Sequence, residues 1–294
     1  MSFTRTNSGI TNGHLFYDAE IIVYTEGGGR SISIEDVEKG IFNSKSIDIK
    51  FWNGLFSAAK FNKKVEFRAL GSKTASKIIR EKIISNSIRN VAVVIDRDLD
   101  FIKEPLPDSP FILYTKGYSW ENDVYSKDNT IDQLNSFVLE QDLSERIKGE
   151  VSLAYDDYMR ISRRLLRLEI IFRRQNKRFI TELKGERFFD SKRSPRINKG
   201  QVLKLIKEKK NELPTRPAVL DERLGGLCPM NNSYGKLLTH LSLAIVSFFC
   251  KRHSSITSIP FLLFESSMLE RYIHKQVMAC DDYYKTIIDR LDTA

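Results

Sequence analysis

The run from Val91 to Asp100, VAVVIDRDLD, limits the possible folds of this chain more than any other stretch. Five consecutive apolar residues end abruptly at Asp96, Arg97 and Asp98, which is typical of a strand buried on both faces of a sheet. Open α/β sheets place their sites at the carboxyl ends of such strands. Alternate residues of an extended chain point the same way, so Asp96 and Asp98 can converge on one hard divalent cation that offsets their repulsion.

Strand-like runs alternate with helical patterns throughout the first half of the sequence. The strands are expected over residues 19–25, 64–70, 91–95 and 111–115, with helices over 48–60 and 74–89. Because crossovers between parallel strands need such helices, this order predicts a mostly parallel four-stranded sheet with flanking helices. Strand signals stop near residue 128, so we predict an α/β domain over residues 1–127, with an insertion at 28–47 that carries one short helix, and a mainly α-helical, basic domain over 128–294.

The chain is basic, with a formal net charge of +9 and a pI of about 9.3. An anionic partner is therefore expected, and nucleic acid is the first candidate. Four arginines that we predict to bind nucleic acid recur at helical spacing opposite an apolar stripe: Arg160, Arg164, Arg167 and Arg174. Further basic residues lie beside them in the sequence: Arg163, Arg173, Lys177 and Arg178. A solvated helix face, or contact with an acidic protein surface, is the alternative interpretation.

A second basic stretch, within residues 184–199, interleaves charged and aromatic residues: Arg187, Phe188, Phe189, Lys192, Arg193 and Arg196. Aromatic rings in such a patch can stack on bases, but packing into the core is the favoured role. Pro214, Pro217 and the Gly225/Gly226 pair mark further turns.

The cysteines and the apolar runs favour a cytoplasmic protein. The three cysteines are widely spaced without a CxxC, so neither a disulfide framework nor a zinc site is expected. The polar start, residues 1–14, leads us to expect no signal peptide. The longest apolar stretch, Leu237 to Cys250, is shorter than the roughly 20 residues that span a bilayer and predicts a buried helix. The four histidines lack ligand spacing, and there is no P-loop, so any ATP hydrolysis would belong to a partner.

Four acids follow strand runs that we assign to one sheet: Glu26, Asp96, Asp98 and Glu121. The carboxyl ends of parallel strands lie at one edge, where these acids can form a single acidic pocket. An acid after a strand is, taken singly, more often a turn former or a helix cap. Four such acids after three strands, two of them separated by one residue and preceded by five apolar residues, favour one shared site.

The pairing of Glu26 and Gly27 with the later Asp96–Asp98 run, separated by a strand that ends at Gly71, resembles the Toprim domain of topoisomerases, primases and OLD-type nucleases. The order IIVYTEG, DIKFW, RALGSK, VAVVIDRDLDFI and FILYTKGYSWEND, within residues 19–127, is similar to the OLD-like Toprim nucleases of anti-phage defence. Within that family the nearest resemblance is to the AriB-type effectors of PARIS systems, which work with an ABC-type ATPase. The run YGKLL, residues 234–238, extends the resemblance weakly.

This resemblance implies phosphodiester chemistry that depends on Mg²⁺, or on Mn²⁺ in its place. It implies that Asp96 and Asp98 hold a metal ion, and that Glu26 acts as general base or acid and shares a metal. Glu121 is then a candidate ligand of a second metal, and one or two metals remain open. Asp48 is a weaker candidate, because about twenty residues separate it from Gly27, against a few in most relatives.

Two lysines that follow strands are candidate phosphate contacts, and solvated loop lysines are the equal alternative: Lys73 and Lys116. The resemblance implies a toxic endonuclease that cleaves host RNA, specifically tRNA, after activation by or release from its ATPase, and that acts as a homodimer. The alternative is a catalytically inert subunit that binds nucleic acid or the ATPase. A topoisomerase or primase fragment is disfavoured, because no tyrosine stands out as a nucleophile and the second half resembles neither enzyme.

Overall fold

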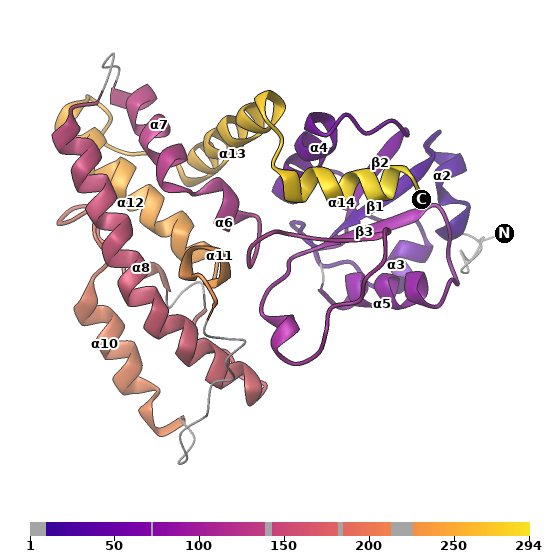
Figure 1. Cartoon of the computed structure of the whole chain (residues 1–294), viewed down its shortest axis with the longest axis horizontal. Helices are drawn as coiled ribbons and strands as arrows, with labels where there is room; N and C mark the ends of the chain where they lie inside the picture. Colours follow the sequence, from indigo (N-terminus) through magenta and orange to yellow (C-terminus); the bar gives the residue numbers. More distant parts are fainter. Residues whose placement is uncertain (1–9, 72, 139–142, 182–184, 213–225) are drawn as a thin grey trace. The chain divides into compact units, whose positions relative to one another are not determined.

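The computed structural model describes residues 10–71, 73–138, 143–181, 185–212 and 226–294 (Figure 1). Contacts within the chain group it into two compact units. The first unit consists of Met1–Arg97, Leu106–Lys116 and Ile273–Ala294, and the second of Asp98–Pro105 and Gly117–Tyr272. The C-terminal residues therefore belong to the same unit as the strands. A folding boundary after residue 127, and an insertion at 28–47, stay predictions.

A four-stranded parallel sheet forms the centre of the first unit, in the order β2-β1-β3-β4. Its strands are β1 (Ile21–Thr25), β2 (Val65–Ala69), β3 (Val91–Ile95) and β4 (Ile112–Tyr114). All residues of β1 and β3 are buried, as expected for central strands of a sheet covered on both faces. The predicted α/β class with four parallel strands is confirmed.

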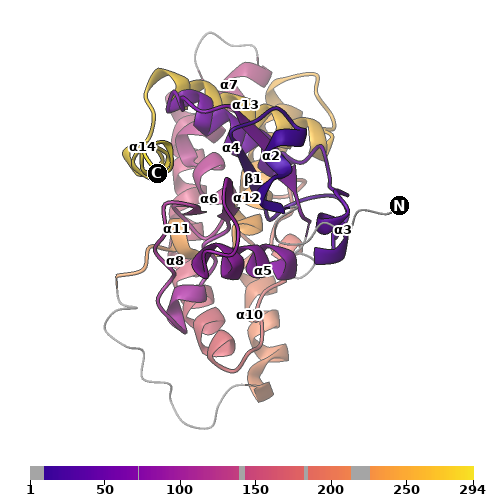
Figure 2. The same ribbon diagram turned by 90° about the vertical axis from the view of Figure 1, so that its right-hand side faces the viewer.

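Helices cover both faces of this sheet (Figures 1 and 2). One face carries α4 (Ile47–Ala58) and α14 (Asp282–Asp292). These two helices are in contact through aromatic side chains: the ring centroid of Tyr284 lies 5.8 Å from those of both Phe51 and Trp52. The other face carries α5 (Lys73–Ile84), which packs Ile79 and Ile83 into a core cluster with strand residues. Two short helices, α2 (Gly13–Phe16) and α3 (Ile34–Glu38), complete this unit.

Helix α5 is shorter than the apolar pattern over residues 74–89 predicted. It ends at Ile84, and the following turn is closed by the Ser87 N–H, which donates to the Lys82 carbonyl. Asn86 and Asn90 both take left-handed backbone angles, with φ of 52° and 57°. Asparagine tolerates this conformation better than most residues, so it can end a helix even where apolar spacing continues.

The second unit is helical in its described part. It contains α6 (Glu121–Val124), α7 (Lys127–Val138), α8 (Glu145–Arg174), α10 (Lys199–Glu208), α11 (Pro229–Asn232), α12 (Lys236–His253) and the start of α13 (Phe261–Met278), with 3-10 turns η1 (Asp100–Ile102) and η2 (Lys210–Glu212). Leu237 to Cys250 lies within α12 and is mostly buried, so the predicted buried helix is confirmed. Of the predicted turn residues, Pro214, Pro217 and Gly225 lie outside the described residues.

Within the described residues, no helix combines the length and the apolar character that crossing a membrane requires. The three cysteines are free thiols: Cys250 is buried, and Cys228 and Cys280 are partly exposed.

Candidate functional site

Two of the predicted site residues stand at the same edge of the sheet. Glu26 directly follows β1 and Asp96 directly follows β3. These strands pair in parallel with Thr25 opposite Val94, so both strands end at the same edge of the sheet. The backbone N–H of Arg97 donates to the Thr115 hydroxyl at 2.9 Å and so joins the ends of β3 and β4.

The side chain of Asp48 lies against Gly27, the residue that follows Glu26. Asp48 lies in the first turn of α4, which is capped by the Ser46 hydroxyl, and the helix dipole there favours a negative charge. A Cβ atom at Gly27 would lie 1.8 Å from an Asp48 carboxylate oxygen. A larger residue at position 27 would therefore displace the Asp48 carboxylate from this position. The long segment between Gly27 and Asp48 does not remove Asp48 from this edge of the sheet.

The loop after Glu26 is held against the loop that follows β2. The Gly71 N–H donates to the Gly27 carbonyl at 3.2 Å, and the Asn43 amide donates to the Arg30 carbonyl at 2.6 Å. Gly71 has a φ of 61°, and a Cβ there would lie 2.1 Å from the Arg30 carbonyl oxygen. The predicted phosphate contact Lys73 begins α5 and is exposed.

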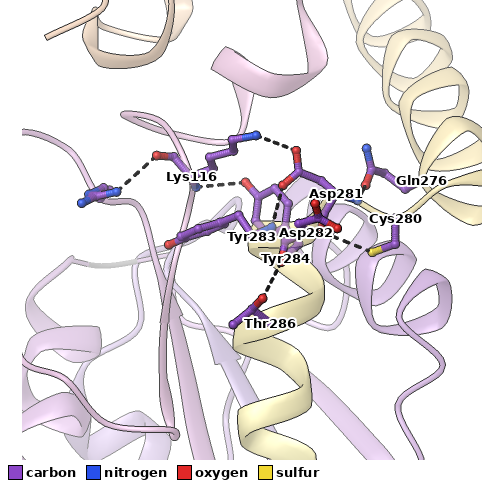
Figure 3. Close-up of polar contacts among 9 residues, drawn as sticks. Lys116, Gln276, Cys280, Asp281, Asp282, Tyr283, Tyr284 and Thr286 are labelled. Carbon is purple, nitrogen blue, oxygen red and sulfur yellow. Dashed lines mark hydrogen bonds and ion pairs between the residues drawn. The ribbon is translucent and has the colours of Figure 1, made fainter. Parts of the chain in front are cut away.

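Lys116 is engaged by the C-terminal helix (Figure 3). Its ammonium lies 2.6 Å from the carboxylate of Asp281, the N-cap residue of α14, and its N–H donates to the Tyr284 hydroxyl at 3.1 Å. The Tyr283 hydroxyl donates to the Tyr114 carbonyl at 3.0 Å. A phosphate contact by Lys116 stays a prediction, and it would have to be shared with Asp281. No local pattern predicts this pairing, because 165 residues separate the two in the sequence.

Asp98 is the first residue of the second unit. It is 7% exposed, it has a φ of 48°, and its N–H donates to the Tyr118 carbonyl at 2.7 Å. The next residue, Leu99, packs in a cluster with Tyr118, Leu166 and Ile170. The backbone that carries Asp98 is thus fixed by burial on α8 and by one short hydrogen bond.

A buried polar network lies behind Asp98 in this unit. The guanidinium of Arg173 donates to the Tyr118 hydroxyl and to the Glu169 carboxylate, both at 2.7 Å. Glu169 also accepts the N–H groups of Phe179 and Ile180. Burial raises the pKa of Tyr118 far above its ordinary value, and the negative charge of Asp98 raises this pKa further. Arg173 therefore faces inward, although its sequence position placed it beside the exposed arginines.

Glu121 is buried and already has a counter-ion. Its carboxylate lies 2.9 Å from the ammonium of Lys236, which is also 3.9 Å from the carboxylate of Glu265. A Cβ at Gly235 would lie 2.2 Å from the Ser119 hydroxyl oxygen and 3.0 Å from Glu121. The YGK run thus begins α12 in close contact with the segment that carries Glu121. Neither Lys236 nor Glu265 is among the predicted site residues. The YGK run at 234–236 was a signal for Lys236, whereas no sequence pattern indicated Glu265.

The predicted nucleic-acid face of α8 is exposed. Arg160, Arg164, Arg167 and Arg174 all have exposed side chains, and the opposite side of the helix is buried. Arg160 forms an ion pair with Asp157. Most basic residues of the second stretch are paired, because Arg187 contacts Glu208, Arg193 contacts Asp190, and Arg196 contacts Glu150 and Asp157. Phe188 is fully buried, which confirms core packing for this ring.

The predicted ligands are all carboxylates, a donor set that suits Mg²⁺ or Mn²⁺ and does not suit zinc, which prefers sulfur and imidazole. The Asp48 carboxylate packs against Gly27, where there is no side chain, and so lies beside the residue that follows Glu26. Among the described residues, no group of three or more His, Cys, Asp or Glu side chains is close enough together to bind a metal ion. Metal ligation by Glu26, Asp96, Asp98 and Glu121 therefore stays a prediction.

The sequence matches no protein-family model, and no curated protein is similar enough to it to count as a relative.

Proposed function

We propose that this chain is a Mg²⁺-dependent endonuclease of the Toprim type that cleaves RNA, with tRNA as the first candidate substrate. The observation that carries the proposal is the parallel sheet that brings Glu26 and Asp96 to one edge, with Asp48 seated against Gly27. Carboxylates gathered at the carboxyl edge of an α/β sheet are suited to binding a hard cation and the phosphate it attracts.

Each residue has a separate role in this proposal. A bound Mg²⁺ supplies charge neutralisation at phosphate oxygens and a more acidic water. Asp96 and Asp98 hold the ion, and Glu26 takes the proton from the attacking water. Lys73 is exposed at the start of α5, where an ammonium can contact phosphate. The exposed arginines of α8 contact the RNA backbone, because their side chains face solvent, whereas that of Arg173 points inward.

The biological part of the proposal rests on the resemblance to AriB-type effectors. The chain is then the toxic effector of an anti-phage abortive-infection system, restrained by an ABC-type ATPase and active as a homodimer in the cytoplasm. Sequencing of RNA ends after expression without the partner, beside a Glu26→Ala control, identifies the substrate and the cleavage position.

The decisive experiment measures cleavage by the purified chain. The protein is incubated with Mg²⁺ and either tRNA, mRNA or duplex DNA, and the same is done with Glu26→Gln, Asp98→Asn and the control Glu104→Gln. Glu104 is exposed and has no partner among the described residues. Cleavage of RNA that is lost in the first two variants and kept in the control supports the proposal. Unchanged cleavage in Glu26→Gln would show that the site is elsewhere.

A second candidate function is an inert subunit that binds nucleic acid or the ATPase. One observation favours it: Glu121 and Lys116, two residues proposed for the site, are each neutralised by a partner from the same chain. Metal binding separates the two candidates. If Mg²⁺ or Mn²⁺ raises the melting temperature of the wild type no more than that of Asp96→Asn/Asp98→Asn, the nuclease proposal loses its support.

A further inference from the structure

A polar cavity of about 190 Å³ lies in the second unit, away from the residues proposed for catalysis in the sequence. One wall is a face of α12 formed by Leu243, Ser247 and Lys251, which are spaced four residues apart. The loop before α13 and one residue of the basic stretch complete the lining: Ser191, Ile256, Thr257, Ser258 and Ile259.

The lining combines one cation with four hydroxyl groups and contains no acid. Lys251 is exposed, and the structure records no hydrogen bond or ion pair for its ammonium within the described part of the chain. Nor does it record a side-chain hydrogen bond there for Ser191, Ser247, Thr257 or Ser258. An ammonium with several hydroxyl donors around it favours an anion with multiple oxygens, and phosphate is the commonest such group.

Two features of the surroundings favour the same charge. Ser258 and Ile259 are separated by Pro260 alone from the first turn of α13, an 18-residue helix without an acidic residue in that turn. Unpaired N–H groups and the dipole make a helix start favourable for anions. The last carbonyls of α12 are partly satisfied, because Ser254 donates to the Cys250 carbonyl and Arg252 to the Phe248 carbonyl. These contacts reduce the unfavourable effect of that helix end.

The size of the cavity limits the ligand. Its volume is several times the roughly 30 Å³ that one water occupies, but it is below the roughly 300 Å³ of sites for drug-sized molecules. The aliphatic side chains of Leu243, Ile256 and Ile259 provide an apolar surface beside the polar groups. A phosphate with an attached sugar meets both requirements.

We propose that this cavity binds the phosphate group of a nucleotide, either within an RNA chain or free. Lys251 and the hydroxyls hold the phosphate, and the aliphatic residues contact the sugar. The proposal goes beyond the nuclease activity, because binding here requires neither metal nor cleavage.

Binding is measured with the full chain in EDTA, which prevents metal-dependent cleavage. Fluorescence anisotropy follows a fluorescein-labelled single-stranded RNA, and adenosine monophosphate is added as a competitor. The variants are Lys251→Gln, which removes the charge, and Ser247→Leu, which narrows the cavity and removes one hydroxyl. Lys204→Gln is the matched control, since Lys204 is an exposed lysine on α10. Circular dichroism confirms that each variant is folded.

Lys251→Gln is expected to weaken RNA binding by about tenfold, which is typical for a lost hydrogen bond to a charged group. Ser247→Leu is expected to weaken it as well, and Lys204→Gln to leave it unchanged. Competition by adenosine monophosphate indicates that the cavity accepts free nucleotides, and failure to compete indicates a phosphate within a chain. Wild-type affinity of both Lys251→Gln and Ser247→Leu for both probes would overturn the proposal. Vesicles of phosphatidylglycerol serve as a third probe. If both substitutions weaken binding to these vesicles and leave RNA binding unchanged, the cavity is a membrane site and the proposal is overturned.

Discussion

The ammonium of Lys236 lies 2.9 Å from the carboxylate of Glu121, a side chain that is 5% exposed. The carboxylate of Glu265 is 3.9 Å from the same ammonium and is nearly as buried. One cation therefore balances two buried anions. Removing one partner of a buried ion pair leaves an uncompensated charge in a poorly solvated place.

Replacement of Lys236 by methionine is expected to lower the free energy of unfolding by about 3 kcal/mol, as measured by urea denaturation. A second substitution, Glu121→Gln, removes one of the two anions and should restore part of the loss. The exposed Lys204→Met is the control and should stay within about 0.5 kcal/mol of the wild type. Equal stability of Lys236→Met and wild type would show that Lys236 is not needed to balance these carboxylates.

A methyl group added at Gly27 should disturb the edge of the sheet, because a Cβ there would lie 1.8 Å from an Asp48 oxygen. We expect Gly27→Ala to lower the free energy of unfolding by about 1–3 kcal/mol and to reduce the Mg²⁺-induced rise in melting temperature. Gly29→Ala is a close control, since a Cβ at Gly29 would meet nothing within 4 Å. The interpretation fails if both alanine variants behave alike in calorimetry.

The sheet could be predicted from the sequence because a strand covered on both faces must be a short apolar run. The runs that became β1 and β3 met that condition along their whole length. Their acids could be placed for the same reason, since the end of an apolar run marks the edge of the sheet. The pairing of Lys116 with Asp281 could not be predicted, because it depends on a C-terminal helix returning to the first unit.

Local patterns also failed where one residue acts against its neighbours. The apolar spacing over residues 74–89 predicted a longer helix than α5, but the left-handed conformation of Asn86 ends it early. Arg173 lies beside the exposed arginines in the sequence, yet its side chain points inward to Glu169 and Tyr118. Periodicity describes a face of a helix, whereas a buried partner for one side chain is a property of the tertiary structure.

The hydroxyl of Tyr118 should stabilise the segment that carries Asp98. It accepts a hydrogen bond from Arg173 at 2.7 Å, and the Tyr118 carbonyl accepts the Asp98 N–H. Tyr118→Phe is expected to cost about 1–2 kcal/mol and to speed hydrogen exchange in residues 98–102. Tyr17→Phe is the control, because no hydrogen bond of the Tyr17 hydroxyl is recorded among the described residues. Unchanged exchange in Tyr118→Phe would remove this hydroxyl from the support of Asp98.

The buried thiol of Cys250 should make the free energy of unfolding fall as the pH rises through the alkaline range. Burial raises its pKa to about 11 from an ordinary value of 9.0. The folded state therefore keeps the proton longer than the unfolded state, and this contribution is complete below pH 9 and is lost as pH rises toward 11. Urea denaturation across this range should show a steeper loss for the wild type than for Cys250→Ala. Parallel curves for the two proteins would contradict the prediction.

The exposed arginines of α8 should contribute to RNA binding through charge. In Arg164→Gln/Arg167→Gln we expect weaker binding, and a slope of log affinity against log salt that is reduced by about 0.7 for each arginine on a single-stranded RNA. Arg146→Gln tests whether position matters, since Arg146 is exposed at the other end of the same helix. Fluorescence anisotropy over a range of salt concentrations provides the measurement. If RNA binding is unchanged while affinity for the ATPase falls, this face recognises an acidic protein surface rather than nucleic acid.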